Sequence, residues 1–485
     1  MNSALIHNHP DPYHITGKEF RRLFPFFLFY TLLTLVVSHH SFFWDKDLIF
    51  SEIAFWLPEH KFSLLLPDSL DVGYLPVLGY LLAFAWLITG KSLVVMHMLM
   101  LPFSVGIVVQ LYRFLRQTLP GNRIIPVMIL VLAEPSLLTQ SIVFSTDLVL
   151  IYFLLLSLNA VLFNRRSMLA IAVFGLLFSH MRGAMGVLMI LLFDGYKNRM
   201  WDNPVHKLHL LTPYLPALLF FAAYTVFHWL KKGWIGYHEN SPWIGCFEVV
   251  DAKGFLRNIF IIGWRLVDFG KLFVVLILFF LIIRFYKQKQ QIDHSLSDLL
   301  VILGLSILAF VPTALIYKVL NSHRYFIPIT MILTIITGVL LYRTNLSEKL
   351  RKTFYWIMLA GLLSGNCWTY PDHIAKGWDA TLAHVPYYSL RNKMLAYIDS
   401  SQIPFSEIGT EVPNNLPLKY YDLSDDERAI GIKNFKRNKY IFYSNIYNTF
   451  TDEEITILKN QWTVEKEFRC LLVRVTLYKN PSDSN

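Results

Sequence analysis

Charged residues are scarce in this sequence. Of its 485 residues, 16% are Asp, Glu, Lys or Arg and 54% are hydrophobic, and the mean hydropathy is +0.43. Water-soluble domains carry roughly a quarter charged residues, so this composition excludes an ordinary soluble enzyme. Apolar runs of about 17–25 residues recur along most of the chain, and each is long enough to cross ~30 Å of hydrocarbon. The sequence therefore predicts a polytopic α-helical membrane protein.

Cysteine is also rare. The chain has three cysteines, Cys246, Cys367 and Cys470, and their wide spacing excludes a disulfide framework and a cysteine-rich metal knuckle. No other metal-ligand spacing is legible, so the sequence leaves open whether a divalent metal ion takes part. The net charge of +10 would indicate nucleic acid as the partner of a soluble chain. In a membrane protein it is explained by basic cytoplasmic loops, and we expect no nucleic-acid partner.

The basic residues orient the chain in the membrane. We take residues 1–22 as a cytoplasmic tail and residues 76–89 as a helix lying in the outer interface, because nearly every short basic loop then falls on the cytoplasmic side. The first outer loop comprises residues 38–90 and contains such interfacial helices. About eleven spans result, at residues 23–37, 93–111, 124–138, 148–163, 170–178, 187–193, 208–230, 273–285, 299–316, 325–341 and 354–363.

The composition changes after Cys367. From residue 370 to residue 485 the chain is polar, charged and rich in aromatic residues. Residues 389–399 and 452–462 have helical patterns, whereas residues 439–447 and 468–478 read as strands. The sequence thus predicts a transmembrane domain at 23–369, followed by a small extracytoplasmic α/β domain at 370–485.

Acidic residues near the membrane are the first candidates for chemistry, because a charge in a bilayer is costly. Asp45 and Asp47 follow the first span, where either suits a general base that takes a proton from an acceptor hydroxyl or amine. The alternative is that both are ordinary loop acids. Asp71 and Asp147 each open an apolar segment, where helix capping or a helix-dipole contact is the alternative. Glu134 precedes a proline inside a predicted span and suits a helix kink equally well.

Basic and aromatic residues at the outer ends of two spans indicate an anion-binding site. His180 and Arg182 interrupt an apolar hairpin near its outer turn. His323, Arg324 and Tyr325 stand at the outer start of another span. Two guanidinium groups at one membrane face suit a phosphate or diphosphate, which arginine binds bidentately. The alternative is that both arginines are interfacial anchors whose charged ends extend toward water.

The order of these motifs resembles the GT-C glycosyltransferases, in particular the branch of the protein O-mannosyltransferases and the bacterial aminoarabinose transferase that modifies lipid A. The tract WDKDLIFSEIAFW is similar to the acid that follows the first span in this branch, with Asp47 or Asp45 as the matching residue. That acid is often part of an Asp-Glu pair, whereas Lys46 and Leu48 stand beside the aspartates here. The branch's Gly-His-Pro-Pro-Leu motif corresponds to GYLPV at residues 73–77, which includes Tyr74.

Three further tracts carry the resemblance. TQSIVFSTDLVLIYFLLLSL is similar to an acid followed by an apolar span, and it matches Asp147 to that acid. LLFSHMRGAMGVLMILL resembles the hairpin of the family that contains a basic residue before glycine and proline, here Arg182. HRYFIPI resembles the Arg-Tyr-x-x-Pro segment, here beginning at Arg324.

The resemblance covers roughly residues 20–345. It implies a glycosyltransferase of the bacterial inner membrane with an extracytoplasmic active site, a polyprenyl-phosphate-linked sugar as donor and inversion at the sugar. The acceptor, whether a lipid, a glycan or a protein, is left open. Two other functions stay open as well. A lipid or polysaccharide transporter would show inverted repeats with broken helices, and an O-antigen ligase or polymerase would lack the acid of the first loop.

Overall fold

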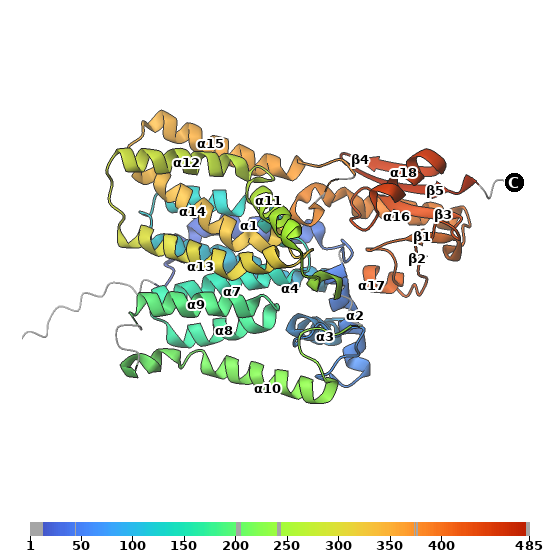
Figure 1. Cartoon of the computed structure of the whole chain (residues 1–485), viewed down its shortest axis with the longest axis horizontal. Helices are drawn as coiled ribbons and strands as arrows, with labels where there is room; N and C mark the ends of the chain where they lie inside the picture. The colour runs from blue at the N-terminus through green and yellow to red at the C-terminus, as the bar shows by residue number, and fades with distance from the viewer. Residues whose placement is uncertain are drawn as a thin grey trace, which may run out of the picture.

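The molecule is a long bundle of helices with a small sheet beyond one end (Figure 1). The computed structural model describes residues 13–43, 45–199, 205–239, 244–372, 374 and 377–481, without the side chains of residues 45–47 and 205–207. The helices of the bundle are α1 Gly17–Val37, α2 Asp45–Glu59, α3 Val77–Thr89, α4 Leu93–Arg116, α5 Ile124–Leu132, α6 Pro135–Gln140, α7 Thr146–Leu162, α8 Arg166–Ser179, α9 Gly183–Lys197, α10 Leu215–Lys232, α11 Ala252–Val267, α12 Lys271–Lys287, α13 His294–Ile316, η4 His323–Phe326, α14 Ile327–Arg343 and α15 Glu348–Ser364.

Several of these helices can cross a membrane by length and composition. Within the described ranges, four helical segments are long and apolar enough: Gly17–Val37, Leu93–Arg116, His294–Ile316 and His323–Arg343. A fifth results if α11 and α12, which meet at 89°, form one broken span. The helices α3, α7 and α8 are apolar but shorter. The molecule is therefore a polytopic helical protein as expected, while the number of eleven spans stays a prediction.

Two breaks in the bundle differ from the expected spans. The predicted span 124–138 is two helices, since α5 ends at Leu132 and Glu134 caps α6 by accepting a hydrogen bond from the Leu137 amide at 2.7 Å. The sequence analysis did not predict α11, which ends at Val267. Gly270, which precedes α12 in the bend between the two helices, adopts φ +80°. A Cβ at Gly270 would lie 1.8 Å from the Gly361 carbonyl oxygen, so this sharp bend also depends on the close approach of α15.

Basic residues gather where the sequence predicts the cytoplasmic loops. Arg116 pairs with Glu19 at 2.8 Å, which ties the end of α4 to the start of α1. Arg166 pairs with Asp194 at 2.6 Å across the ends of α8 and α9. The connection from α12 to α13 lies at the end of the bundle away from the sheet (Figure 1). Arg343 donates to the carboxylate of Asp293 in this connection, and it also donates to the Thr118 carbonyl at 3.4 Å. These loops therefore meet at one end.

A C-terminal unit at the other end, residues 386–479, combines helices with a five-stranded sheet of order β2-β1-β3-β5-β4. The first three strands in this order are parallel, and β5 pairs antiparallel with both β3 and β4. The predicted strand 468–478 is in fact a hairpin that turns at Leu471 and Leu472. The helices and strands of the C-terminal unit are α16 Pro386–Ser400, β1 Ile408–Thr410, α17 Leu418–Asp422, β2 Gly431–Ile432, β3 Tyr440–Ser444, α18 Asp452–Gln461, β4 Thr463–Cys470 and β5 Val473–Lys479.

Candidate active site

Asp147 lies at the start of α7, buried at the sheet end of the bundle. Ser145 caps this helix by accepting hydrogen bonds from the amides of Asp147 and Leu148, each at 3.2 Å. The Ser145 hydroxyl in turn donates to Gln140, at the end of α6. Asp147 is 2% exposed. A carboxylate buried this deeply in an apolar bundle needs positive partners.

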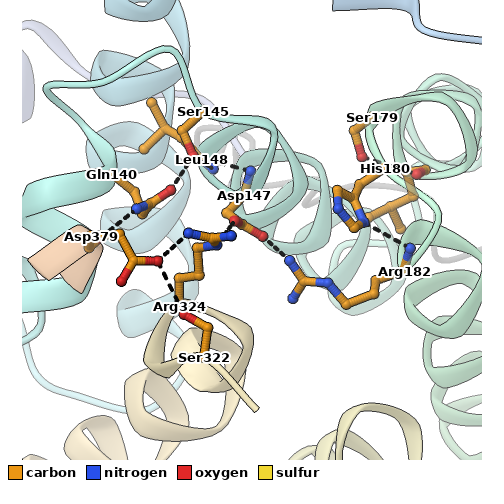
Figure 2. Close-up of polar contacts among 11 residues, drawn as sticks. Gln140, Ser145, Asp147, Leu148, Ser179, His180, Arg182, Ser322, Arg324 and Asp379 are labelled. Carbon is orange, nitrogen blue, oxygen red and sulfur yellow. Dashed lines mark hydrogen bonds and ion pairs between the residues drawn. The ribbon is translucent and has the colours of Figure 1, made fainter. Parts of the chain in front are cut away.

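Two arginines from separate parts of the chain supply those partners (Figure 2). Arg182, in the turn between α8 and α9, forms an ion pair with one Asp147 oxygen. Arg324, in η4, approaches the other oxygen with its Nε at 3.3 Å. The Arg182 guanidinium also lies over the Tyr325 ring, 3.9 Å from its centroid, a favourable cation–π contact. The structure therefore brings together four residues that the sequence predicted as a site.

The cluster continues into a segment that the sequence did not indicate. Arg324 forms a second ion pair with Asp379, which belongs to the short helix η6, Trp378–Ala380. Ser322 donates to the same carboxylate at 3.1 Å, and Gln140 donates to the Asp379 carbonyl at 2.8 Å. The order Arg182–Asp147–Arg324–Asp379 alternates in charge and sums to zero. Each arginine is thus paired with at least one buried carboxylate.

Donor groups remain available around Arg182. Its side chain is 14% exposed, and in the described contacts the guanidinium donates to Asp147 through Nη2, while its Nε is enclosed by the protein. A guanidinium has five N–H donors in a planar fork, so an oxyanion beside Arg182 would find unused donors. Small exposure keeps such contacts strong, because little water competes for them.

Tyr74 and His180 border the same site. Their rings lie 6.1 Å apart, and His180 Nδ1 accepts a hydrogen bond from the Arg182 amide at 3.0 Å. Burial, and then the nearby charge of Asp147, raise the pKa of Tyr74 well above its usual range. Tyr74 therefore remains a neutral hydroxyl. Tyr74 belongs to the loop between α2 and α3. This loop therefore reaches the arginine cluster, which consists of Arg182, Asp147, Arg324 and Asp379.

Three other predicted site residues lie in separate contacts. His323 contacts Asp268 at 2.7 Å, at the bend between α11 and α12. Glu134 pairs with Lys271 at 3.3 Å, and both side chains are at most 4% exposed. Asp71 pairs with His228 of α10 at 3.0 Å.

In the described contacts these residues therefore join helices of the bundle to one another and to the first loop; their predicted place in the site stays a prediction. Asp71 also accepts from the Gly73 amide at 2.9 Å. Two further residues join the contact of His323 with Asp268 at the bend between α11 and α12. Arg265 Nη1 lies 3.3 Å from His323 Nε2, and the Tyr370 hydroxyl donates to Asp268.

The two candidate bases are placed by their backbone only. Asp45 is the first residue of α2 and Asp47 the third, and both side chains lie outside the described ones. The helix itself lies close to the site's supporting loop, since Phe50 of α2 packs on Phe144 with ring centroids 5.9 Å apart. Phe144 precedes Asp147 by three residues. Among the described residues, no group of three or more His, Cys, Asp or Glu side chains is placed to hold a metal ion.

Sequence reasoning missed Asp379, Asp268 and Arg265. Asp379 is in a segment that reads as loop, without apolar periodicity, and only the fold of the chain brings it beside α6 and η4. Arg265 and Asp268 lie at the end of α11, a helix that the apolar runs did not reveal. Their charges between two apolar arms were the available signal, since intramembrane charges mark functional positions by default.

The chain is similar in fold to a solved glycosyltransferase. The structure is similar to the crystal structure of ArnT from Cupriavidus metallidurans bound to undecaprenyl phosphate, with a TM-score of 0.50 and 11% sequence identity. The similarity covers 95% of this chain and 98% of ArnT. ArnT is the lipid A aminoarabinose transferase, a GT-C enzyme, so the fold is that of the branch that the motifs resemble. No protein-family model and no curated protein matches the sequence.

Proposed function

We propose that the protein is a membrane glycosyltransferase that moves a sugar from a polyprenyl-phosphate-linked donor to an extracytoplasmic acceptor. One observation carries this proposal: two arginines converge on one buried carboxylate at the sheet end of a bundle with the ArnT fold. The related crystal structure contains undecaprenyl phosphate, and an arginine pair is suited to bind the phosphate of such a lipid. The acceptor is a lipid, a glycan or a protein.

The proposed chemistry uses residues of the cluster in defined ways. An acceptor hydroxyl or amine attacks the anomeric carbon, and the bond from this carbon to the phosphate oxygen breaks. Negative charge grows on the departing polyprenyl phosphate, where Arg182 and Arg324 stabilise it. Asp47, or Asp45 in its place, accepts the proton that the acceptor loses. The configuration at the anomeric carbon inverts, because the acceptor attacks one face of this carbon and the phosphate leaves from the opposite face.

Asp379 and Asp147 have different places in this proposal. Asp147 contacts both arginines, and its backbone amide donates to Ser145 at the start of α7; its carboxylate therefore holds the two guanidinium groups close together. Of the two arginines, Asp379 pairs only with Arg324 in the described contacts, and it belongs to a segment outside the helical bundle. We therefore propose that the donor phosphate replaces Asp379 on Arg324, and that Asp147 remains bound.

The same geometry supports an orientation of the site in the membrane. The arginine cluster and the C-terminal unit lie at one end, and the basic loops lie at the other. By the positive-inside rule the basic end faces the cytoplasm. We propose a multi-pass protein of the bacterial inner membrane, with its site and residues 370–485 on the periplasmic face.

Turnover by the purified protein tests the proposal. The protein in detergent, with an undecaprenyl-phosphate-linked sugar and a mixture of envelope lipids and glycans, should release undecaprenyl phosphate and label an acceptor. A variant in which Ala replaces both Arg182 and Arg324 is the blank. A transporter would move the intact donor across a vesicle membrane without cleaving it. Donor movement without cleavage, across a panel of donor sugars, would refute the glycosyltransferase proposal.

A further inference from the structure

The loop between α1 and α2 is buried against the C-terminal unit. Ser41, Phe42 and Phe43 are 8%, 3% and 1% exposed, although they follow directly on a long apolar helix. The Phe42 amide donates to the Tyr421 carbonyl at 3.2 Å, and the Ser41 hydroxyl donates to the Asp422 carboxylate. Both acceptors belong to α17, so this loop is attached to the short helix by backbone and by side chain.

Stacked rings hold the same loop from α16 and the turn before it. His40 stacks on Tyr388 with centroids 4.2 Å apart, and Phe43 stacks on His384 at 4.4 Å. The His40 carbonyl lies 3.1 Å from Nε2 of His97 in α4. Stacked aromatic pairs restrict orientation as well as burying area. The loop is therefore fixed between the bundle and the C-terminal unit.

Asp422 is itself held in place by a buried polar network. Arg391 of α16 is 2% exposed, and its Nη1 donates to both Asp422 oxygens at 2.9 and 3.0 Å. Its Nε donates to Asn414 at 2.6 Å, and Asn414 donates to the Tyr387 and Tyr447 hydroxyls. Such a network has few alternative arrangements. Burying a charged network costs desolvation free energy and is a poor way to stabilise a domain, but such a network suits the role of fixing the position of Asp422.

A second attachment lies farther along the chain. The Ser51 hydroxyl of α2 is buried and donates to the Tyr420 carbonyl at 2.8 Å. Residues 41–42 and residue 51 are thus bound to three consecutive residues, Tyr420 to Asp422. Asp45 and Asp47 lie between the two attachments in sequence. The backbone that carries both candidate bases is fixed on each side by α17.

We propose that the C-terminal unit is a positioning element, in which α17 holds Ser41 and Phe42 on one side and Ser51 on the other, and so sets the place of the general base. This inference rests on the proposed glycosyltransferase function. A general base must lie within hydrogen-bond reach of the proton that it removes, and a misplacement of about 1 Å can cost about 10²-fold in rate. The clamp residues Ser41, Ser51, Asp422 and Arg391 touch neither the donor site nor the arginine cluster in the described contacts, and act through the position of α2.

The test weakens the clamp, since the backbone hydrogen bond from Phe42 to Tyr421 remains, and it leaves the buried network intact. Ser41→Ala and Ser51→Ala, combined in one chain, delete both side-chain hydrogen bonds to α17 and keep the Arg391–Asp422 pair. We expect kcat for transfer to fall roughly tenfold or more, with the Kd for undecaprenyl phosphate unchanged. Amide hydrogen exchange of residues 45–50 should rise. Ser389→Ala, at an exposed serine of α16, is the matched control and should change none of these.

The outcomes separate the clamp from a general structural role. An unchanged kcat despite faster exchange would overturn the inference, and so would equal losses of donor affinity and turnover. Asp422→Asn, which also leaves Arg391 without its carboxylate, should lower kcat further in the fraction that folds. If the parent protein transfers no sugar, the proposed function fails by itself. The exchange measurement then decides the clamp, which is refuted if residues 45–50 exchange as in the parent.

Discussion

Arg182 and Arg324 approach the two oxygens of one carboxylate, although they come from different hairpins of the bundle. The shared partner, Asp147, keeps two positive charges close together that would otherwise repel each other. A site of this kind presents two guanidinium forks to one ligand at the cost of one buried acid. Interfacial anchors would instead extend to water separately, which is not the arrangement of these side chains.

We expect Arg182→Ala or Arg324→Ala to lower donor turnover by roughly 10²-fold or more, because each removes a charged donor aimed at the developing negative charge. Lysine at either position should restore activity only in part, since an ammonium group cannot form the bidentate contact. Steady-state release of undecaprenyl phosphate measures the effect. Arg257→Ala, at an exposed arginine of α11, is the control. Full activity of both alanine variants would assign the arginines to anchoring alone.

Asp379→Asn should tighten the binding of undecaprenyl phosphate by roughly tenfold, equivalent to about 1.4 kcal/mol. The reason is competition between residue 379 and the phosphate for Arg324. A neutral amide binds Arg324 less tightly than a carboxylate does, so the incoming phosphate displaces a weaker contact. Equilibrium binding to the protein in detergent measures the change. Asp399→Asn, at an exposed partner of Arg428 in the C-terminal unit, should leave the affinity as it is. Weaker binding by the Asp379 variant would show that this acid orients Arg324 instead of competing for it.

The sequence predicted most of this cluster because its signals are local. Asp147, Arg182 and Arg324 each stand at the end of an apolar run, where a charge is conspicuous and where helix direction places it at the outer face. Asp379 has no such signal. It reaches Arg324 only because the chain after α15 folds back onto α6 and η4, and a long-range contact of that kind leaves no pattern in a single sequence.

The fold was predictable to a similar degree. Apolar runs located most of the bundle helices, since the hydrophobic period and length decide them. The amphipathic helix α11 was missed because Arg257 and Arg265 interrupt its apolar run. The hairpin of β4 and β5 was taken for one strand, because its turn consists of two leucines and contains no glycine, asparagine or proline to mark it.

Glu134→Gln should destabilise the protein by about 3–5 kcal/mol, because it leaves the Lys271 ammonium buried without its counter-ion. The double variant Glu134→Leu with Lys271→Met should recover much of this stability, since it removes both charges. Thermal unfolding in detergent provides the comparison. Glu248→Gln breaks an ion pair of the same type, 2.8 Å long, with both side chains 56% exposed. That control should cost no more than about 1 kcal/mol, and an equal loss in both single variants would contradict the argument.

The pH dependence of stability should carry a contribution from Glu52. Burial in α2 raises the pKa of Glu52 to about 7, above its ordinary value of 4.5. A raised pKa means that folding favours the protonated form. The favourable contribution is therefore complete below pH 4.5, declines as the pH rises toward 7, and is lost above it.

Glu52→Gln should accordingly raise the unfolding temperature relative to the parent at pH 8 and change it little at pH 4.5. The glutamine resembles the protonated acid and cannot ionise. Thermal unfolding of both proteins between these pH values gives the difference, in which contributions from other groups cancel. Glu59→Gln, at an exposed position of the same helix, is the control. A stability difference that is constant with pH would show that Glu52 does not titrate in this range.

The general base is the last residue to be tested, and Asp47 is the proposed one. It stands closer than Asp45 to the SEIAFW tract, which resembles the frame that GT-C enzymes place after their acid. Positions two residues apart on a helix are separated by about 200° around its axis, so the two acids are not interchangeable.

Asp47→Asn keeps the shape of the side chain and removes its basicity. We expect it to abolish transfer while donor binding and the unfolding temperature stay near the parent values, and Asp45→Asn to cost much less. A dead Asp45 variant beside an active Asp47 variant would move the base two residues toward the N-terminus. Parent-like transfer by both variants would refute the proposal that the first outer loop supplies the base, because its remaining candidate, Asp71, is paired with His228.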